Sequence, residues 1–292
     1  MDLEEKLGSI YNLRTWGFIE SGIPALDDNS TFEQGKTTLF AARPGMFAKR
    51  LIGQLILRVC IQYKNPLAHF SFERSVKETI DHFLWCLTLD TRFLSSDSFS
   101  EELGNSEAID NAFKLIKQSP YWIETRKEYA CLESLIDLLR KRVKNHNIRL
   151  VVIDYLELCS SIELSKNKSI SNEEKRGSEL KKLKAVAREL DVHIIITSVL
   201  SNYVDLRPYH EKRPEIDDIN IEKPFHCVDS IVLFYRPEFY GIKQWDIYGN
   251  KKERLSTRNC IEISLHQKES FSGKCLLEFN NPCTEFRDIT PF

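Results

Sequence analysis

Short apolar runs alternate with longer amphipathic stretches along most of the chain. Five of these runs are short, mostly apolar and partly β-branched, as expected for strands that are covered on both faces; they span residues 38–42, 67–72, 150–154, 192–198 and 230–234. Helical periodicity occupies residues 47–63, 75–92, 106–117, 132–146 and 174–190. This alternation predicts an α/β domain with a mainly parallel central sheet and helices on both faces.

The last third of the chain has a different pattern. Two strand-like segments, at residues 260–266 and 274–280, flank a turn and predict a C-terminal β-hairpin. Predicted loops cover residues 94–105, 160–173 and 201–224. Because there is no internal repeat, we expect a short N-terminal remnant at residues 1–12 and a single domain over residues 13–292.

Composition and charge narrow the possible classes of protein. The 292 residues suffice for one large core, and the net charge of −2 lacks the basic excess of strong nucleic-acid binders. No stretch approaches the roughly 20 apolar residues needed to span a bilayer, and the acidic start does not resemble a signal peptide. We therefore expect a cytoplasmic protein without a membrane partner.

None of the 8 cysteines falls in a CxxC pair, which argues against a zinc site.

The tetrapeptide GKTT at residues 35–38 looks like the end of a phosphate-binding P-loop, G-x-x-x-x-G-K-[ST]. Ser30 stands where the first glycine of that motif is required. The residues after Thr37 have the pattern of a strand, whereas a P-loop needs a helix whose N-terminus faces the phosphates. We interpret the tetrapeptide as a turn that leads into a strand.

A better position for such a loop lies between strand 38–42 and the helix that follows it. The sequence AARPGM at residues 41–46 resembles the A-A-R-P-S-M that precedes G-K-T in the ATPase domain of DnaB-type replicative helicases, which have a RecA-like P-loop NTPase fold. Aligned without gaps, the glycine, lysine and threonine of the family fall on Phe47, Ala48 and Lys49. The resemblance therefore implies a degenerate Walker A loop, whose candidate phosphate-binding residues are Arg43, Gly45, Phe47, Ala48 and Lys49.

Further segments resemble the same family in the same order. FSFERS at residues 70–75 is similar to F-S-L-E-M-S, which makes Glu73 the counterpart of the catalytic base. LVVIDYLEL at residues 150–158 is similar to the Walker B segment L-I-V-I-D-Y-L-Q-L, in which Asp154 would bind Mg²⁺. Similar matches occur in ESGIPALD at 20–27, LKAVAREL at 183–190 and LFYRPEFY at 233–240.

Several functional positions of the family are changed here. The sensor glutamine falls on Val199, and the DNA-contacting R-E-S-G falls on residues 220–223. The arginine finger falls on Lys268, which keeps the charge but not the bidentate geometry. An arginine finger alone contributes roughly 10³–10⁵ in rate, so its loss together with the phosphate lysine implies no turnover. Glu73 and Asp154 are retained, although a buried acid at a strand end can also persist as a hydrogen-bond acceptor.

Three functions are compatible with these residues. The first is a pseudo-ATPase without ATP or Mg²⁺, which binds a helicase or another replication or mobile-element protein and can form oligomers through the RecA-type interface. The second is a divergent but active ATP-dependent DNA helicase, in which Glu73, Asp154 and Lys49 carry ATP and Mg²⁺. The third is a module for single-stranded DNA that uses basic residues of 166–184 and beyond. Its candidate contacts are Lys181, Lys182, Arg213 and Lys223.

Overall fold

The computed structural model describes residues 17–29, 31–89, 107–159, 169–208, 211–244, 256–267, 272–280 and 285–289. Its strands are β1 (Thr37–Ala42), β2 (Leu67–Ser71), β3 (Tyr121–Glu124), β4 (Leu150–Asp154), β5 (His193–Val199), β6 (Ser230–Tyr235), β7 (Cys260–Gln267), β8 (Ser272–Phe279) and β9 (Phe286–Asp288). Its α-helices are α2 (Pro24–Asp27), α3 (Ala48–Leu57), α4 (Val76–Thr88), α5 (Glu107–Gln118), α6 (Leu132–His146), α8 (Asn172–Leu190), α9 (Tyr203–Leu206) and α10 (Pro224–Cys227). The π-helix η1 (Arg58–Gln62) and the 3₁₀ turns η3 (Lys127–Ala130), η4 (Leu156–Leu158), η6 (Ile216–Asp218) and η7 (Pro237–Tyr240) complete the described elements.

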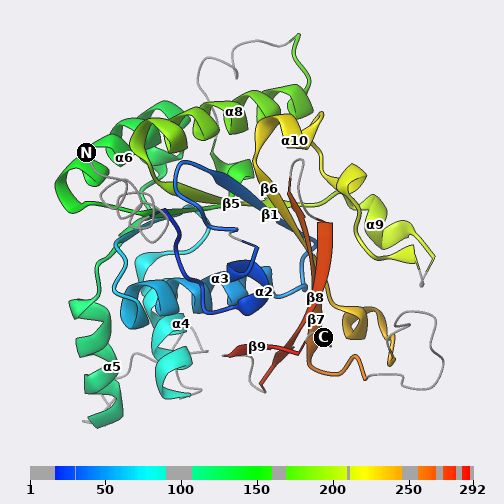
Figure 1. The fold of residues 1–292 in the computed structure, drawn as a ribbon, viewed down its shortest axis with the longest axis horizontal. Coiled ribbons are helices and arrows are strands. Elements are labelled where there is room, and N and C mark those ends of the chain that lie inside the picture. Colours follow the sequence, from blue (N-terminus) through cyan, green and yellow to red (C-terminus); the bar gives the residue numbers. More distant parts are fainter. Residues whose placement is uncertain are drawn as a thin grey trace, which may run out of the picture.

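One sheet contains the described strands, in the order β3-β2-β4-β5-β1-β6-β7-β8-β9. The strands from β3 to β6 in this order pair in parallel, and β7, β8 and β9 are added antiparallel. The predicted parallel sheet and C-terminal hairpin are both confirmed. The hairpin, β7–β8, continues the main sheet instead of forming a separate unit (Figure 1).

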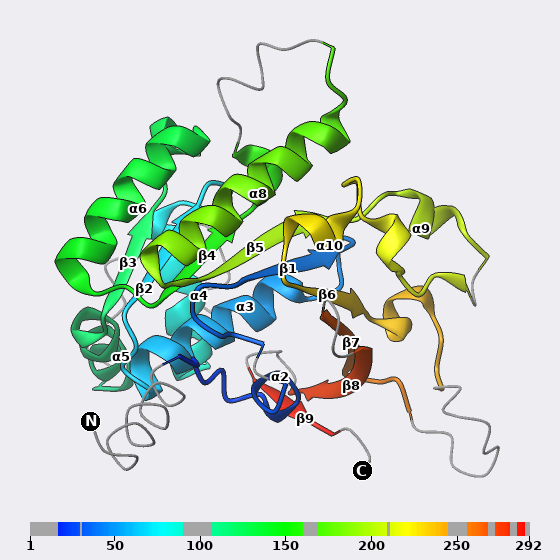
Figure 2. The same cartoon turned by 45° about the horizontal axis from the view of Figure 1, so that its top comes forward.

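Helices cover both faces of the sheet, with α3 and α4 on one side and α6, α8 and α10 on the other (Figure 1; Figure 2). Successive residues of a strand point to opposite faces, so each strand contributes to two cores. On β1, Phe40 packs in the core beneath α3, while Leu39 belongs to the core beneath α8. On β5, Ile195 lies in the core beneath α3 and Ile194 in the core beneath α8. This explains why these strands are mainly apolar on both faces, without the alternation of a strand that has one exposed face.

Most predicted elements agree with the structure to within a few residues. The helix predicted over 132–146 has the same bounds as α6, whereas the one predicted over 47–63 divides into α3 and η1. The edge strands β3 and β9 were not predicted. The predicted loop over 201–224 contains the short helices α9 and η6, and the predicted loop 94–105 lies outside the described residues. Among the helices that the structure describes, none is long and apolar enough to cross a membrane.

Candidate functional site

The loop that connects β1 to α3 has the backbone conformation of a glycine-containing turn. The amide of Met46 donates to the carbonyl oxygen of Arg43 at 3.4 Å. Gly45 has φ 87°, and Phe47, immediately before α3, is also left-handed with φ 62° and ψ 14°. A non-glycine residue in this region costs about 1–2 kcal/mol. The conformation at Phe47 is therefore one that glycine adopts without strain, in agreement with the alignment of the family's glycine to this position.

The side chain of Phe47 packs towards the C-terminal strands. Its ring meets the ring of Phe279 on β8 edge-on, with centroids 5.1 Å apart and an interplanar angle of 84°. The guanidinium of Arg236 lies 4.1 Å from the Phe47 centroid, and that of Arg50 lies 5.5 Å away. These contacts stabilise a backbone conformation that is otherwise unfavourable for phenylalanine.

The aromatic ring that covers Gly45 belongs to Phe239, in η7. A Cβ atom added at Gly45 would lie only 2.5 Å from a carbon of the Phe239 ring. Phe239 is 52% exposed, so its ring also forms part of the surface beside the loop. The sequence did not predict Phe239 as a site residue. It lies in the segment 233–240, whose resemblance to the family was the only indication that it could be near the site.

Arg43, at the start of the loop, is anchored to the segment that follows β5. Its Nε and Nη2 donate to Oδ2 of Asp205 at 2.8 and 2.6 Å, and its Nη1 donates to the carbonyl oxygen of Leu200 at 2.9 Å. The hydroxyl of Tyr240 donates to the other oxygen of Asp205 at 2.8 Å. Burial raises the pKa of Asp205, but the hydrogen bonds from Arg43 and Tyr240 oppose it, and the resulting pKa lies below the ordinary value. The guanidinium of Arg43 is therefore already bonded to groups of the protein itself, namely Asp205 and the carbonyl oxygen of Leu200.

Lys49 and Glu73, predicted on different segments, are brought together as an ion pair. Their side chains are 37% and 43% exposed, and the Lys49 ammonium lies 5.2 Å from the centroid of the Tyr155 ring. Burial lowers the pKa of Lys49, while the charge of Asp154 opposes that shift. Ala48 provides no ammonium group and Lys49 no hydroxyl. The loop therefore lacks the ammonium and the hydroxyl with which the G-K-T of the family binds the phosphates of a nucleoside triphosphate and Mg²⁺.

Two acidic residues, one at the end of β4 and one in η4, accept hydrogen bonds from β5. Asp154 is only 6% exposed, and its Oδ1 accepts from the hydroxyl of Thr197 at 2.7 Å. Glu157 was not predicted as a site residue. Its Oε1 accepts from the hydroxyl of Ser198 at 2.5 Å and from the amide of Val199 at 2.9 Å. Glu157 thus fixes the backbone at Val199, onto which the sequence resemblance maps the sensor glutamine of the family.

Three of the four basic residues predicted for DNA contact are paired with carboxylates. The pairs are Lys182–Glu133 at 3.7 Å, Arg213–Glu262 at 2.9 Å and Lys223–Glu222 at 3.4 Å. Glu262 is only 4% exposed, so Arg213 has a structural role whatever else it binds. Lys181 is exposed on α8. Lys268, at the position of the arginine finger, lies outside the described residues, as do Lys166 and Lys168.

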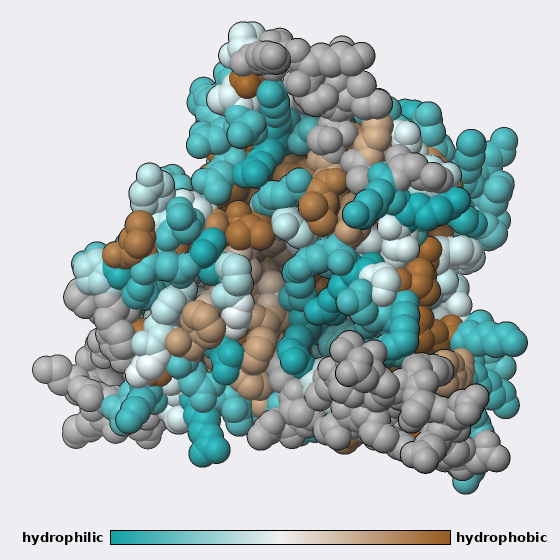
Figure 3. Space-filling model, turned by 180° about the vertical axis from the view of Figure 1, so that it is seen from behind, coloured by the Kyte–Doolittle hydropathy of each residue, from teal (hydrophilic) through white to brown (hydrophobic). Residues whose placement is uncertain are grey.

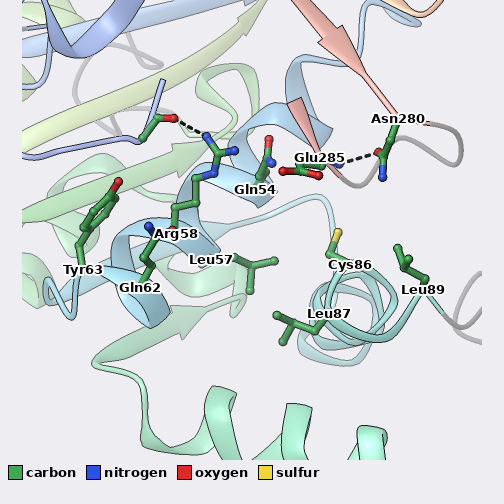
Figure 4. A pocket seen from close by; sticks show the side chains of 11 residues that line it. Gln54, Leu57, Arg58, Gln62, Tyr63, Cys86, Leu87, Leu89, Asn280 and Glu285 are labelled. Carbon is green, nitrogen blue, oxygen red and sulfur yellow. Dashed lines mark hydrogen bonds between the residues drawn. The ribbon is translucent and has the colours of Figure 1, made fainter. Parts of the chain in front are cut away.

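A polar groove of 590 Å³ lies beside the C-terminal end of α3, at the opposite end of this helix from the β1–α3 loop. Figure 4 shows the side chains that line it. Leu57, Cys86 and Leu87 form apolar parts of its lining. Arg58 also lines it, but its guanidinium is bound to the carbonyl oxygens of Gly22 and Phe286 at 2.6 and 3.1 Å. None of the predicted site residues contributes to this groove.

The face seen from behind is mainly hydrophilic, with hydrophobic side chains in separate patches (Figure 3). The described residues include exposed apolar side chains on several different elements, such as Leu89, Phe113, Tyr203 and Leu206. Single exposed apolar residues are usual on protein surfaces and do not by themselves indicate a binding site.

Comparison with known proteins relates this architecture to replicative helicases. The family described as DnaB-like helicase C terminal domain matches residues 18–288. The replicative DNA helicase DnaB of Rickettsia prowazekii (strain Madrid E) is 26% identical over 248 residues, which are 80% of this chain and 49% of the relative. That of Mycoplasma pneumoniae (strain ATCC 29342 / M129 / Subtype 1) is 25% identical over 285 residues, covering 92% of this chain and 56% of the relative. The chain spans about half the length of the curated relatives it matches.

Solved structures show the same fold. One ATPase domain has a TM-score of 0.73 at 23% identity, with 99% of both chains covered. The structure of a DnaB-like replicative helicase and its interactions with primase also gives a TM-score of 0.73 at 23% identity, covering 98% of this chain and 67% of that chain. With its RecA-like sheet and the family match across nearly its whole length, the chain belongs to the DnaB-like helicase C terminal domain family.

Proposed function

We propose that this chain is a DnaB-like helicase domain that acts by binding a protein partner and does not hydrolyse ATP. The observation that carries the proposal is the ion pair between Lys49 and Glu73 in a loop without the family's lysine and threonine. In a P-loop, the lysine neutralises the β- and γ-phosphates and the hydroxyl binds Mg²⁺. Glu73, the counterpart of the catalytic base, is instead paired with the ammonium group of Lys49, so it is not available to activate a water molecule.

The proposed partner is a protein of replication or mobile-element DNA metabolism, such as a true helicase. The family supports this choice, and one of the similar solved structures concerns a helicase and its interactions with primase. Single-stranded DNA is a weaker candidate, because Lys182, Arg213 and Lys223 already pair with carboxylates. The proposed binding can be measured by mixing the chain with the DnaB-type helicase of the same organism and following co-elution with light scattering. Separate elution of the two proteins would count against this partner.

Nucleotide binding is tested by thermal unfolding with increasing Mg·ATP. A ligand at 100 times its Kd stabilises the folded state by about 2.7 kcal/mol, which raises the Tm of a domain of this size by about 5 °C or more. We expect no shift for the natural chain. The control is the triple variant Phe47→Gly, Ala48→Lys, Lys49→Thr, which restores the family's G-K-T and is expected to gain a shift.

A shift in the natural chain as large as that in the restored variant would refute the expected absence of nucleotide binding. It would favour the other function, a divergent active ATPase in which Glu73, Asp154 and Lys49 carry ATP and Mg²⁺. Circular dichroism shows whether the triple variant is folded. If it is not, phosphate release by the natural chain decides the question, since measurable Mg·ATP turnover is incompatible with the proposed function.

A further inference from the structure

The side of β8 that faces away from β7, its outer side, is paired along only part of the strand. On this side β9 pairs with residues 277–279, and the amide of Ile289 donates to the carbonyl oxygen of Leu276 at 2.9 Å. Residues 272–275 pair with β7 on their inner side, but among the described residues no strand lies on their outer side. An open strand edge presents backbone donors and acceptors that can pair with another chain.

The hydrogen bonds of β8 show which residues direct their backbone groups outward. In an antiparallel strand, the N–H and C=O groups of successive residues point alternately to the two neighbouring strands. Leu276 accepts from the residue after β9, on the outer side, whereas the amide of Phe279 donates at 2.8 Å to Asn259, which immediately precedes β7. Even-numbered residues of β8 therefore direct these groups outward. Those of Ser272 and Lys274 meet no strand there among the described residues.

The side chains of this edge restrict what can pair with it. Gly273 lies between the two outward residues, and a glycine inside a strand often marks a place where another backbone approaches closely. Lys274 is exposed and pairs with the buried Glu262 at 3.7 Å. A lysine on an edge strand discourages pairing when a like charge lies directly opposite. We therefore expect a strand added here to place an uncharged or acidic residue opposite Lys274.

A second copy of the same chain meets this requirement in one register. A two-fold axis through Gly273, perpendicular to the sheet, sets the two glycines opposite each other. Ser272 of each copy then lies opposite Lys274 of the other, and these two residues exchange both of their backbone hydrogen bonds. An axis through Lys274 would instead bring the two lysines together and set Ser272 opposite Leu276, whose carbonyl oxygen is already used. In the register centred on Gly273, Ser272 and Lys274 satisfy each other without a like-charge pair.

We propose that two copies of this chain associate through their β8 edges, in an antiparallel pair centred on Gly273 that continues the sheet from one copy into the other. The pairing uses backbone groups of residues 272–274 and none of the β1–α3 loop. The inference therefore goes beyond the proposed function and does not depend on the absence of ATP hydrolysis. Because the paired segment is short, we expect a weak dimer whose population rises with protein concentration.

Disulfide formation by Gly273→Cys tests the register. Residues opposite each other in a non-hydrogen-bonded antiparallel pair have Cα atoms about 4.5 Å apart, within the range of about 4.4–6.8 Å that a disulfide bridges. We expect oxidised Gly273→Cys to migrate as a covalent dimer on a non-reducing gel. The matched control is Lys274→Cys, whose two cysteines would be offset by two residues and lie about 8 Å apart. The natural chain, with its 8 cysteines, is the second control. No dimer from Gly273→Cys, or as much from either control, would overturn the proposal.

Light scattering of the uncrosslinked protein tests the backbone contact itself. Lys274→Pro removes an outward N–H group and leaves the pairing with β7 intact, because proline is tolerated on an edge strand when the missing donor faces away from the sheet. One hydrogen bond is lost in each half of the interface, so we expect the dimer Kd to rise at least about tenfold. Lys274→Ala, which keeps the amide, should associate like the natural chain. A natural chain that is monomeric at every concentration would contradict the proposal.

Hydrogen exchange distinguishes a second copy from the chain's own residues. Protection of the Lys274 amide should increase with protein concentration if a second copy covers the edge. Protection that is equal at all concentrations would assign the edge to the chain itself, in which residues 290–292 come after Ile289, and would refute the dimer. The measurement needs no substitution, so it decides the question even when a variant does not fold. A Mg·ATP shift in the natural chain would count against the proposed function without affecting this inference.

Discussion

The left-handed backbone of Phe47 predicts an unusual order of stability for two substitutions at this position. Phe47→Ala removes the ring and its contacts with Phe279 and Arg236 but keeps a side chain at φ 62°. A fully buried phenylalanine loses about 3–5 kcal/mol when truncated to alanine, and for this half-buried ring we expect about 2 kcal/mol. Phe47→Gly loses the same contacts but recovers about 1–2 kcal/mol of backbone strain. The glycine variant should therefore be more stable than the alanine variant.

The assay is thermal and urea-induced unfolding of the natural chain and both variants. A difference of 1 kcal/mol corresponds to about 2–4 °C in Tm, so Phe47→Gly should melt above Phe47→Ala by at least that amount. The control is the same pair of substitutions at Lys181, an exposed position inside α8. There the order reverses, since glycine in a helix interior is less favourable than alanine by about 1 kcal/mol.

If Phe47→Gly proved less stable than Phe47→Ala while the pair at Lys181 behaved as expected, the left-handed assignment at Phe47 would be wrong. Equal stability of the two Phe47 variants would mean that strain at this position is negligible. In that case the alignment of Phe47 with the family's glycine would rest on sequence alone.

Three further substitutions test other contacts of the site and core. Gly45→Ala should lower the free energy of unfolding, as measured in urea, by about 1–2 kcal/mol through its positive φ and further through the close contact of its Cβ with the Phe239 ring. In a Phe239→Ala background only the φ cost should remain, and an equal loss in both backgrounds would exclude the predicted contact. Arg213→Ala should cost about 2 kcal/mol because it leaves the buried Glu262 with only its longer ion pair to Lys274, at 3.7 Å, and Glu262→Gln should relieve part of this loss in thermal melts. Burial lowers the pKa of His193 to about 4, so the folded state resists a proton that the unfolded state takes up near pH 6.5. His193 should therefore contribute a fall of about 2 kcal/mol in the free energy of unfolding between about pH 7 and pH 5. His193→Gln should remove this contribution but not those of His69 and His82, whose pKa values burial also lowers.

The central strands could be predicted from the sequence because both faces of the sheet are covered and most of their residues are apolar. The helix 132–146 was equally clear, since its period is regular and α6 has no irregular turn. The edge strand β3 was missed because its four residues are half-buried and lack that continuous apolar pattern. A three-residue strand such as β9 is defined mainly by its pairing with β8, which local sequence does not encode.

The candidate site was predictable in its positions but not in its contacts. The resemblance singles out Lys49, Glu73 and Asp154, and the parallel pairing of β2 with β4 explains why the two acids lie near each other. The direction of the Lys49 side chain depends on the rotation of α3 against β2, which is a tertiary property. The role of Glu157 likewise depends on the end of β5, and the ring of Phe239 reaches Gly45 only because η7 folds back over the loop.

The two edges of the sheet restrict how a partner can be recognised. One edge is β3, with four residues, and the other is β9, with three. The four-residue β3 leaves few free backbone groups for pairing with another chain. The strand β9 pairs only with residues 277–279 of β8, so among the described residues the first half of β8 has no strand on its outer side. Recognition by the addition of a strand depends on a run of main-chain hydrogen bonds, and this half of β8 offers a longer run than β3 does. A protein that binds the domain elsewhere must recognise side chains on its helices and loops, and its specificity will depend on surface shape and charge.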